Sequence, residues 1–414
     1  MPDLHVDRGS TARLDRVEGE LTVGRGARIT AASGKGVTVT GAARFEGDAD
    51  IDCDFACDSL GVERGALKVS GDLTVLKEID VAHTVKASGA VKAGEIEVGG
   101  KMLAGSVSCE GTVRVGGMVE VAKVVEAQAV DVGGKVKVGG AVKLKDLRVG
   151  GLAKVGGGTI SGKAKVGGVF ESTGPLEFGD LQVYGKCSLP AGKGKRLATW
   201  GKLSVGGDLD CEEVEVGGVA DVRGNCRSKT MTINGKLDVS GSLSASGTLD
   251  NFGSSEIRGD FAGEELHVAG RFKASKGVVE NRAEIAGEVE TAKGLKAKSI
   301  VVGTGSRVRG PLVGGRIELS KSRMVVADWN ANWMGQAAAL RLVGRMTNAE
   351  DVYGDEVVLG PSARCRNIFA KTVELGAGSV VEQVTYTDEL RQGHHEVHLT
   401  KPSEKVDKLP PFPL

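Results

Sequence analysis

The residue types that could carry chemistry are few and scattered along this chain. His394, His395 and His398 occur near its end in the segment HHEVH, with Glu396 among them. Imidazole and carboxylate groups at such spacing can bind zinc. The segment lies where the sequence repeats described below come to an end, and no cysteine is close in sequence. We therefore expect a solvated terminal segment and no metal site.

Cys53 and Cys57 are separated by three residues, a spacing that could also ligate a metal. No second pair of cysteines follows, and a zinc site built from cysteines needs one. The two thiols are expected to point inward from a short strand.

Single histidines and a basic loop complete the candidates. His83 or His267 could serve as the general base of an acyltransferase, but each stands alone, and we expect surface or corner positions. The segment AGKGKR at 191–196 lacks the residue order of a phosphate-binding loop and is expected to be a flexible corner. No Ser-His-Asp set, paired carboxylates or dinucleotide fingerprint occurs. The sequence predicts no enzyme, no catalytic residue, no cofactor and no metal.

Composition narrows the range of partners. Lys plus Arg and Asp plus Glu number 54 each, so the net charge is zero. Nucleic acid is an unexpected partner, because phosphate binding needs a basic surplus. No apolar run is long enough to span a membrane. Seven scattered cysteines are expected to be reduced thiols, and a cytoplasmic location follows.

The element that positions every residue is a short repeat. From Val81 onward one apolar position returns at a constant spacing, and the later steps are mostly of similar length. It falls on Val81, Val98, Val115, Val132, Val149, Val166, Val183, Thr199, Val216, Ile233, Asn251, Val268, Ile285, Val302, Leu319, Leu342, Leu359 and Leu375. So short a period is typical of a solenoid, in which each repeat buries its apolar face against its neighbours.

Each repeat divides into units of six, six and five, as in VGGKVK, VGGAVK and LKDLR at 132–148. Apolar residues two apart, with a polar residue between them, indicate short strands, and the paired glycines indicate corners. We predict an all-β fold: a single long right-handed parallel β-helix with triangular coils of about 17 residues and roughly 20 coils.

The same pattern sets the expected boundaries. Residues 1–20 are expected to be an N-terminal cap or tail, and 21–391 the β-helix, irregular over 21–80 and regular over 81–391. One step, from Leu319 to Leu342, is clearly longer than the others and predicts an insertion around 327–340. The polar, proline-containing segment 392–414 is expected to be disordered.

Two tryptophans, Trp329 and Trp333, lie in the predicted insertion. Tryptophan is enriched at binding hot spots. The pair is therefore a candidate protein-contact site; the other interpretation is that it folds back to fill a gap beside the coils.

Several units resemble those of the bactofilins, a family of polymer-forming cytoskeletal proteins. They are VGGDLD at 205–210, INGKLDVSGSLS at 233–244 and IRGDFAGEELHVAGRFKA at 257–274. The resemblance covers about 23 to 390 and implies a right-handed β-helix that assembles end to end into filaments without nucleotide. The chain is several times longer than the usual bactofilin domain. It also lacks an apolar N-terminal stretch, so membrane association is not expected.

The units also resemble the hexapeptide repeats of left-handed β-helical acyltransferases. That coil needs three sides of equal length, each a hexapeptide, whereas this chain drops one residue per turn. The acyltransferase remains a less favoured alternative.

The expected function follows from the ends of a solenoid, where strand edges carry unpaired backbone groups. We expect a structural, self-associating scaffold or cytoskeletal protein that forms filaments or multimers, and whose faces could also bind other proteins. A monomeric scaffold that binds partners along its faces or through its tail is the alternative. The residues of the candidate polymer-end coil are Leu375, Val380, Val381, Val384 and Tyr386.

Overall fold

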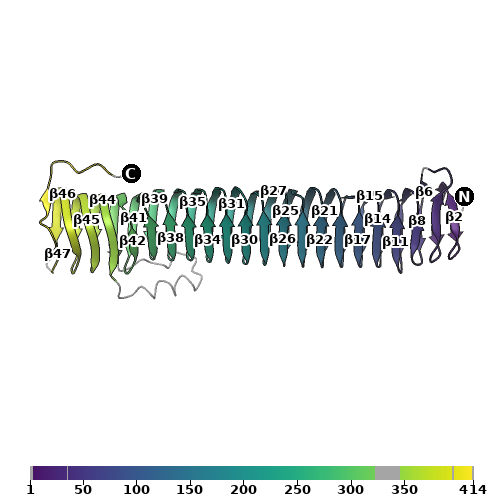
Figure 1. Ribbon diagram of the computed structural model, residues 1–414, viewed down its shortest axis with the longest axis horizontal. Coiled ribbons are helices and arrows are strands. Elements are labelled where there is room, and N and C mark those ends of the chain that lie inside the picture. Colours follow the sequence, from purple (N-terminus) through teal and green to yellow (C-terminus); the bar gives the residue numbers. More distant parts are fainter. Residues whose placement is uncertain (1–2, 35, 322–345, 394–395, 413–414) are drawn as a thin grey trace. The chain divides into compact units, whose positions relative to one another are not determined.

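The computed structural model describes residues 3–34, 36–321, 346–393 and 396–412. It divides into two compact units, Met1–Gly201 and Lys202–Leu414, and each is described by itself. Among the described residues every regular element is a β-strand, and in both units successive strands run parallel in stacked coils (Figure 1). The predicted all-β parallel solenoid is confirmed.

The strands of the first unit are β1 (Leu4–Val6), β2 (Thr11–Leu14), β3 (Arg16–Val17), β4 (Leu21–Val23), β5 (Arg28–Ala31), β6 (Val37–Val39), β7 (Ala42–Phe45), β8 (Ala49–Ile51), β9 (Phe55–Cys57), β10 (Ser59–Val62), β11 (Ala66–Val69), β12 (Leu73–Val75), β13 (Glu78–Val81), β14 (Thr84–Ala87), β15 (Ala90–Ala93), β16 (Glu95–Val98), β17 (Lys101–Ala104), β18 (Ser106–Cys109), β19 (Thr112–Val115), β20 (Met118–Val121), β21 (Val125–Val132), β22 (Lys135–Val138), β23 (Val142–Val149), β24 (Leu152–Val155), β25 (Gly158–Val166), β26 (Val169–Ser172), β27 (Leu176–Val183), β28 (Lys186–Leu189) and β29 (Gly192–Thr199).

Those of the second unit are β30 (Lys202–Val205), β31 (Leu209–Val216), β32 (Val219–Val222), β33 (Cys226–Ile233), β34 (Lys236–Val239), β35 (Leu243–Asn251), β36 (Ser254–Ile257), β37 (Phe261–Val268), β38 (Arg271–Ala274), β39 (Gly277–Ile285), β40 (Glu288–Thr291), β41 (Leu295–Gly303), β42 (Arg307–Arg309), β43 (Leu312–Lys321), β44 (Thr347–Leu359), β45 (Ala363–Leu375), β46 (Val380–Gln392), β47 (His398–Leu399) and β48 (Glu404–Lys405).

Each coil has three sides, and the sequence alternation decides which side chains fill its interior. In β13, Ile79 and Val81 are buried, while Glu78 and Asp80 are exposed. The strand pairs with β16, so that Glu78 lies beside Glu95 and Val81 beside Val98. Because the strands are parallel and in register, each inward position forms a column of apolar side chains from coil to coil.

The corners of the coil change along the chain. From β1 to β18 a coil holds three separate short strands, whereas β21 bends through one corner as a continuous strand of 8 residues and pairs with both β18 and β19. In the second unit, β44, β45 and β46 each extend over 13 residues. The sequence predicts three separate strands in every coil. The strand continues unbroken through this corner because its backbone pairing is kept while two successive residues face outward. In β23 these residues are Lys145 and Asp146.

The glycine corners are tightly stacked. A Cβ atom added to Gly150 would come within van der Waals overlap of the Gly133 carbonyl oxygen in the preceding coil. The Gly150 N–H donates to the carbonyl of Val132 at 3.1 Å, which fixes this approach. Glycine is needed here because the backbones lie too close for a side chain between them.

The core is narrow and dominated by valine, with a few large aromatic residues and one notable polar one. Phe261 and Phe272 are fully buried and meet edge to face, with ring centroids 5.3 Å apart. Asn251 takes an apolar position of the repeat and is fully buried. Its amide nitrogen donates to the Arg271 carbonyl at 2.7 Å, and its Oδ1 accepts from the Ser255 hydroxyl at 2.9 Å. These bonds offset the cost of burying the amide.

The solenoid begins earlier than the sequence predicts. Residues 1–20 are expected to be a cap or tail, yet β1, β2 and β3 pair with β4, β5 and β6 and form the first coil. The pattern is hard to see because the coil that follows is longer than the regular ones, so that Leu21 pairs with Ala43.

The insertion is longer than predicted. Leu319 pairs directly with Leu359, so Leu342 does not take the next position of that column. The predicted step from Leu319 to Leu342 is wrong, because an apolar residue near the expected spacing falls inside the inserted segment. Residues 327–340, with Trp329 and Trp333, lie outside the described residues.

The close packing of the glycine corners gives a first prediction. Gly150→Ala should destabilise the fold by about 1–3 kcal/mol, the usual cost of forcing an extra group into a packed site. Gly61→Ala is the matched control, since an added Cβ there meets nothing within 4 Å; it should change stability by less than about 0.5 kcal/mol. Urea unfolding followed by far-ultraviolet circular dichroism measures both. Equal midpoints for the two variants would contradict the account of the corners.

Candidate functional site

The two histidines considered as general bases have different surroundings. His83 is exposed at a corner, and its carbonyl accepts a backbone hydrogen bond from Lys101 at 2.8 Å. His267 lies on β37, where its imidazole is 17% exposed and its Nδ1 is 2.8 Å from Asp250 Oδ1 on β35. The surface or corner position that the sequence predicts is right for His83 and wrong for His267. The alternation places His267 on the outer face, but the neighbouring coils cover its ring.

The pKa of His267 reflects two opposing effects. Burial of the imidazole lowers its pKa, while the hydrogen bond to Asp250 and the negative charges of Asp250, Glu284 and Glu265 raise it. The second effect prevails, and the pKa lies above its ordinary value of 6.5. Asp250 thus favours the protonated imidazole, and the contact joins the neighbouring strands β35 and β37.

The other candidate ligands do not come together. His394 and His395 lie outside the described residues, and His398 is exposed on β47. Cys57 points into the core, where burial raises the pKa of its thiol to about 12, whereas Cys53 is only half buried. Inward cysteines are thus confirmed for one of the two. Within the described parts of the chain, no group of three histidine, cysteine or carboxylate side chains is arranged to hold a metal ion.

The segment 191–196 belongs to a strand rather than to a flexible corner. Gly192 and Gly194 lie on β29 and pair with Leu176 and Phe178 of β27. A Cβ atom at Gly194 would overlap the ring of Phe178. Glycine at this position makes room for an aromatic ring. The glycines of this segment therefore serve strand packing and do not form a phosphate-binding loop.

An exposed aromatic pair was not singled out in the sequence. Tyr184 and Trp200 are 51% and 43% exposed, and their rings stack 4.8 Å apart at 11°. Both follow a buried position of the repeat, where glycine stands in the preceding coils at Gly150 and Gly167. The replacement of a corner glycine by an aromatic residue in two successive coils was the signal available.

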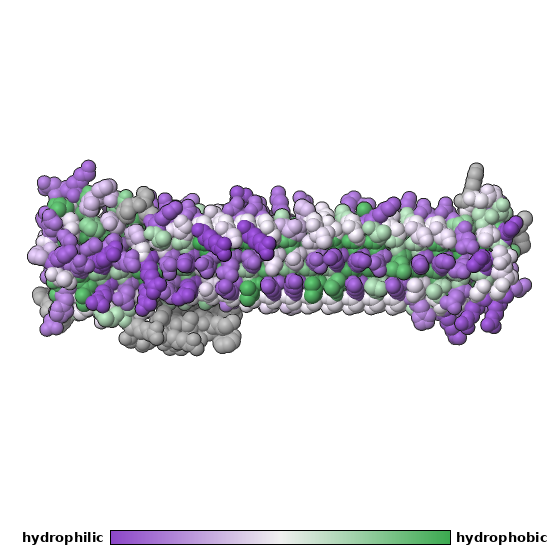
Figure 2. Space-filling model, in the orientation of Figure 1, coloured by the Kyte–Doolittle hydropathy of each residue, from purple (hydrophilic) through white to green (hydrophobic). Residues whose placement is uncertain are grey.

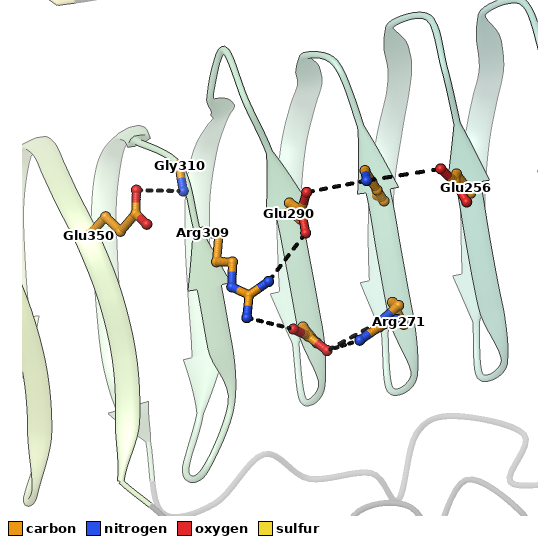
Figure 3. A network of polar contacts seen from close by, with 8 residues as sticks. Glu256, Arg271, Glu290, Arg309, Gly310 and Glu350 are labelled. Atoms are coloured by element: carbon orange, nitrogen blue, oxygen red, sulfur yellow. Dashed lines mark hydrogen bonds and ion pairs between the residues drawn. The ribbon is translucent and has the colours of Figure 1, made fainter.

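The outer face of the second unit carries ordered charges (Figure 3). Lys273 lies 3.9 Å from Glu256 and 3.3 Å from Glu290 on neighbouring coils, and Arg309 continues the column 3.5 Å from Glu290. Beside them, Glu288 accepts from Arg271 at 2.9 Å, and that hydrogen bond lowers the pKa of the Glu288 carboxyl. Opposite charges on successive coils thus pair across the coils of this face. On the face shown in Figure 2, hydrophilic side chains lie in rows with small or apolar ones between them.

Unsatisfied backbone groups are found at the first coil. β1 pairs with β4 and β2 with β5. Within the described residues, β1, β2 and β3 pair with β4, β5 and β6 and with no strand on their other side. We call this side the N-terminal edge. It is the arrangement in the described chain that most plainly calls for a partner, because a strand edge is a template for further pairing.

The residues proposed from sequence as a polymer end lie on two successive strands of the second unit. Leu375 belongs to β45, while Val380, Val381, Val384 and Tyr386 belong to β46. Leu375, Val381 and Val384 are buried, and Val380 and Tyr386 are half buried. The outer edge of this coil is partly covered: β47 pairs with Val380 and Val381, and β48 pairs with Thr385 and Tyr386.

The segment 392–414, expected to be disordered, supplies this cover. Val397, Leu399, Val406 and Leu409 are half buried, while the polar residues between them are exposed. Its proline and lysine content hid the pattern. The alternation of Val397 and Leu399, with Leu399 one coil length after its partner Val381, was the signal that the repeat continues.

Comparisons with known proteins found no match for this chain. No family model, no curated protein and no solved structure matches it. Within the described residues, no helix has the length and apolar character needed to cross a membrane.

The His267–Asp250 pair predicts a dependence of stability on pH. Because the pKa of His267 is raised in the folded state, its contribution is complete below about pH 6.5 and is lost as the pH rises through the folded value. The difference in free energy of unfolding between the native chain and His267→Gln should therefore be larger at pH 5.5 than at pH 8.5. Urea unfolding at both pH values measures it.

Asp250→Asn is the matched test, since it removes the carboxylate and keeps a hydrogen-bonding side chain. In this variant the midpoint of the His267 titration, followed by nuclear magnetic resonance, should fall. An unchanged midpoint would show that Asp250 does not hold the proton on the ring.

Proposed function

We propose that this chain is a structural protein that associates with further copies of itself through the edges of its coils, without nucleotide or cofactor. The observation that carries the proposal is the N-terminal edge, where three strands of a parallel ladder pair on one side alone among the described residues. The solenoid would serve as a scaffold or cytoskeletal element.

The direction of the backbone groups at this edge can be worked out. The Arg28 N–H donates to the Ser10 carbonyl at 2.8 Å, and the Ala32 N–H donates to the Leu14 carbonyl at 2.9 Å. In a parallel strand alternate residues bond to opposite neighbours. The N–H and C=O groups of Thr11 and Arg13 therefore point away from β5, toward the place that a further coil would occupy.

The side chains of the first coil give a second support. Leu4 and Ala12 face inward but are only half buried, whereas Leu21 and Ile29, their partners in the next coil, are fully buried. Leu4 and Ala12 thus lack full cover on one side, although Val6 and Val17 of the same coil are buried. A second copy placed against this edge would bury them and would add backbone hydrogen bonds worth roughly 0.5–1.5 kcal/mol each.

Charge and composition are consistent with self-association. A net charge of zero removes long-range repulsion between copies, and the V-x-G-x-V units resemble those of the bactofilins. Free cysteines throughout the described chain suit a reducing compartment, so we propose the cytoplasm as its location.

Arg13→Pro tests the N-terminal edge. Proline removes the outward N–H of residue 13, and edge strands tolerate it where that group faces solvent. We expect self-association of the full chain to weaken about tenfold, as the loss of one well-placed hydrogen bond allows. Arg13→Ala is the control, because it removes the same side chain and keeps the N–H. Analytical ultracentrifugation over a range of concentrations measures both variants.

Circular dichroism spectra establish that both variants are folded. A full chain that stays monomeric at every concentration would contradict the proposal and favour the monomeric scaffold. Equal association of Arg13→Pro and Arg13→Ala would show that association does not use the N-terminal edge.

A further inference from the structure

We infer that the outer edge of β46 is an interaction surface for a second copy of this chain, and that residues 396–412, the C-terminal cover, compete with that copy for it. The inference rests on the proposed self-association and identifies a second surface for it, one that is closed by the chain's own end. Figure 1 shows the cover, in yellow, leaving β46 and turning back along the flank of the second unit.

The cover pairs with the edge as a strand would, but only in part. The backbone N–H groups of His398 and Thr400 donate to the carbonyls of Ser379 and Val381, both at 3.0 Å. Farther along, the Val406 N–H donates to the Tyr386 carbonyl at 2.9 Å. An ion pair joins Lys401 Nζ to Glu382 Oε1 at 3.0 Å. These are the contacts of an added edge strand, a recurring mode of peptide binding.

Much of the edge remains uncovered. β46 extends to Gln392, and within the described residues nothing pairs with the outer side of 387–392. Most residues of the cover are exposed, and Pro402 interrupts it between its two strands. By contrast, β45 pairs with β46 from Arg364 to Leu375. A complete coil would therefore make more backbone hydrogen bonds with this edge than the cover does.

The far end of the cover is anchored by one aromatic residue. The ring of Phe412 meets Tyr353 edge to face with centroids 6.0 Å apart, and Tyr353 stacks on Phe369 at 4.8 Å. Phe412 also borders a groove of about 400 Å³ whose lining includes Val278 and Val313. Phe412 is 50% exposed, so it can detach without opening the core.

A second copy is the occupant that fits this edge best. β46 belongs to a parallel ladder whose inward residues Val381 and Val384 continue the apolar columns. The N-terminal edge of another copy offers parallel strands with inward Leu4 and Ala12 in need of cover. Stacking the two would continue the same ladder from molecule to molecule.

Competition with the cover makes this stacking conditional. The cover is tethered to the edge, which gives it an effective concentration in the millimolar range. A second copy must overcome that advantage through its larger paired area. Conditions that detach the cover would therefore favour stacking, whereas an attached cover weakens each junction between the N-terminal edge of one copy and β46 of the next.

The cover can be tested by removing it. Deletion of 396–414 should raise the weight-average mass at a fixed concentration, measured by ultracentrifugation. A synthetic peptide of residues 396–412, added in excess, should reverse the increase. Equal mass distributions for the deletion variant and the full chain would overturn the inference.

A milder pair of variants excludes misfolding as the explanation. Thr400→Pro removes the N–H that donates to Val381, while Thr400→Ala keeps it. In the full chain, Thr400→Pro should associate more strongly than Thr400→Ala, and equal association would contradict the competition. Far-ultraviolet circular dichroism checks that both are folded.

Peptide binding separates this inference from the proposed function. At nanomolar protein, where copies do not meet, the labelled peptide 396–412 should bind the deletion variant, as followed by fluorescence anisotropy. Phe412→Ala in the peptide should weaken binding about 2- to 10-fold, as expected for one aromatic contact. Absence of binding would overturn the inference even if Arg13→Pro weakens association. Peptide binding together with assembly that is insensitive to Arg13→Pro would support the C-terminal surface and count against the N-terminal edge alone.

Discussion

The structure depends on parallel backbone pairing between successive coils, held in register by a short and regular repeat. Pairings such as Glu78 with Glu95 place each residue beside its equivalent in the next coil. The narrow apolar core, the stacked glycine corners and the rows of outward charge all follow from this register. The register also brings outward side chains of successive coils together, which lets Lys273 lie between Glu256 and Glu290.

The sequence predicts this interior well because the physical requirement recurs. Two-residue alternation places Val81 and Val98 inward, and paired glycines mark corners where a side chain would strike the preceding backbone. Features that occur in a single coil, and so leave no repeated pattern in the sequence, could not be predicted. The corner at Lys145–Asp146 needs no glycine because the strand bends there unbroken, and Leu342 mimics a repeat position that Leu359 fills.

The candidate sites show the same limit. Cys57 and His83 could be placed from the repeat alone, since position within a coil decides burial. The burial of His267 beside Asp250 could not, because it depends on which side chains the neighbouring coils present. Nor could the cover over β46 be predicted, since its apolar residues are few and separated by prolines and charges; composition indicated disorder where four residues at alternating or spaced positions suffice for docking.

In a solenoid the backbone hydrogen-bonding groups are paired along the sides but not necessarily at the first and last coils. Along the sides, backbone groups are bonded to both neighbouring coils, and ion pairs such as Lys137–Glu120 and Lys143–Glu126 join adjacent coils. At the first coil, the outward backbone groups of Thr11 and Arg13 and the side chains of Leu4 and Ala12 have neighbours on one side only among the described residues. At β46 the chain's own terminal segment pairs with part of the exposed strand edge. A junction between two copies would need both kinds of end: the N-terminal edge of one copy is open to pairing, whereas β46 of the other must first lose its cover.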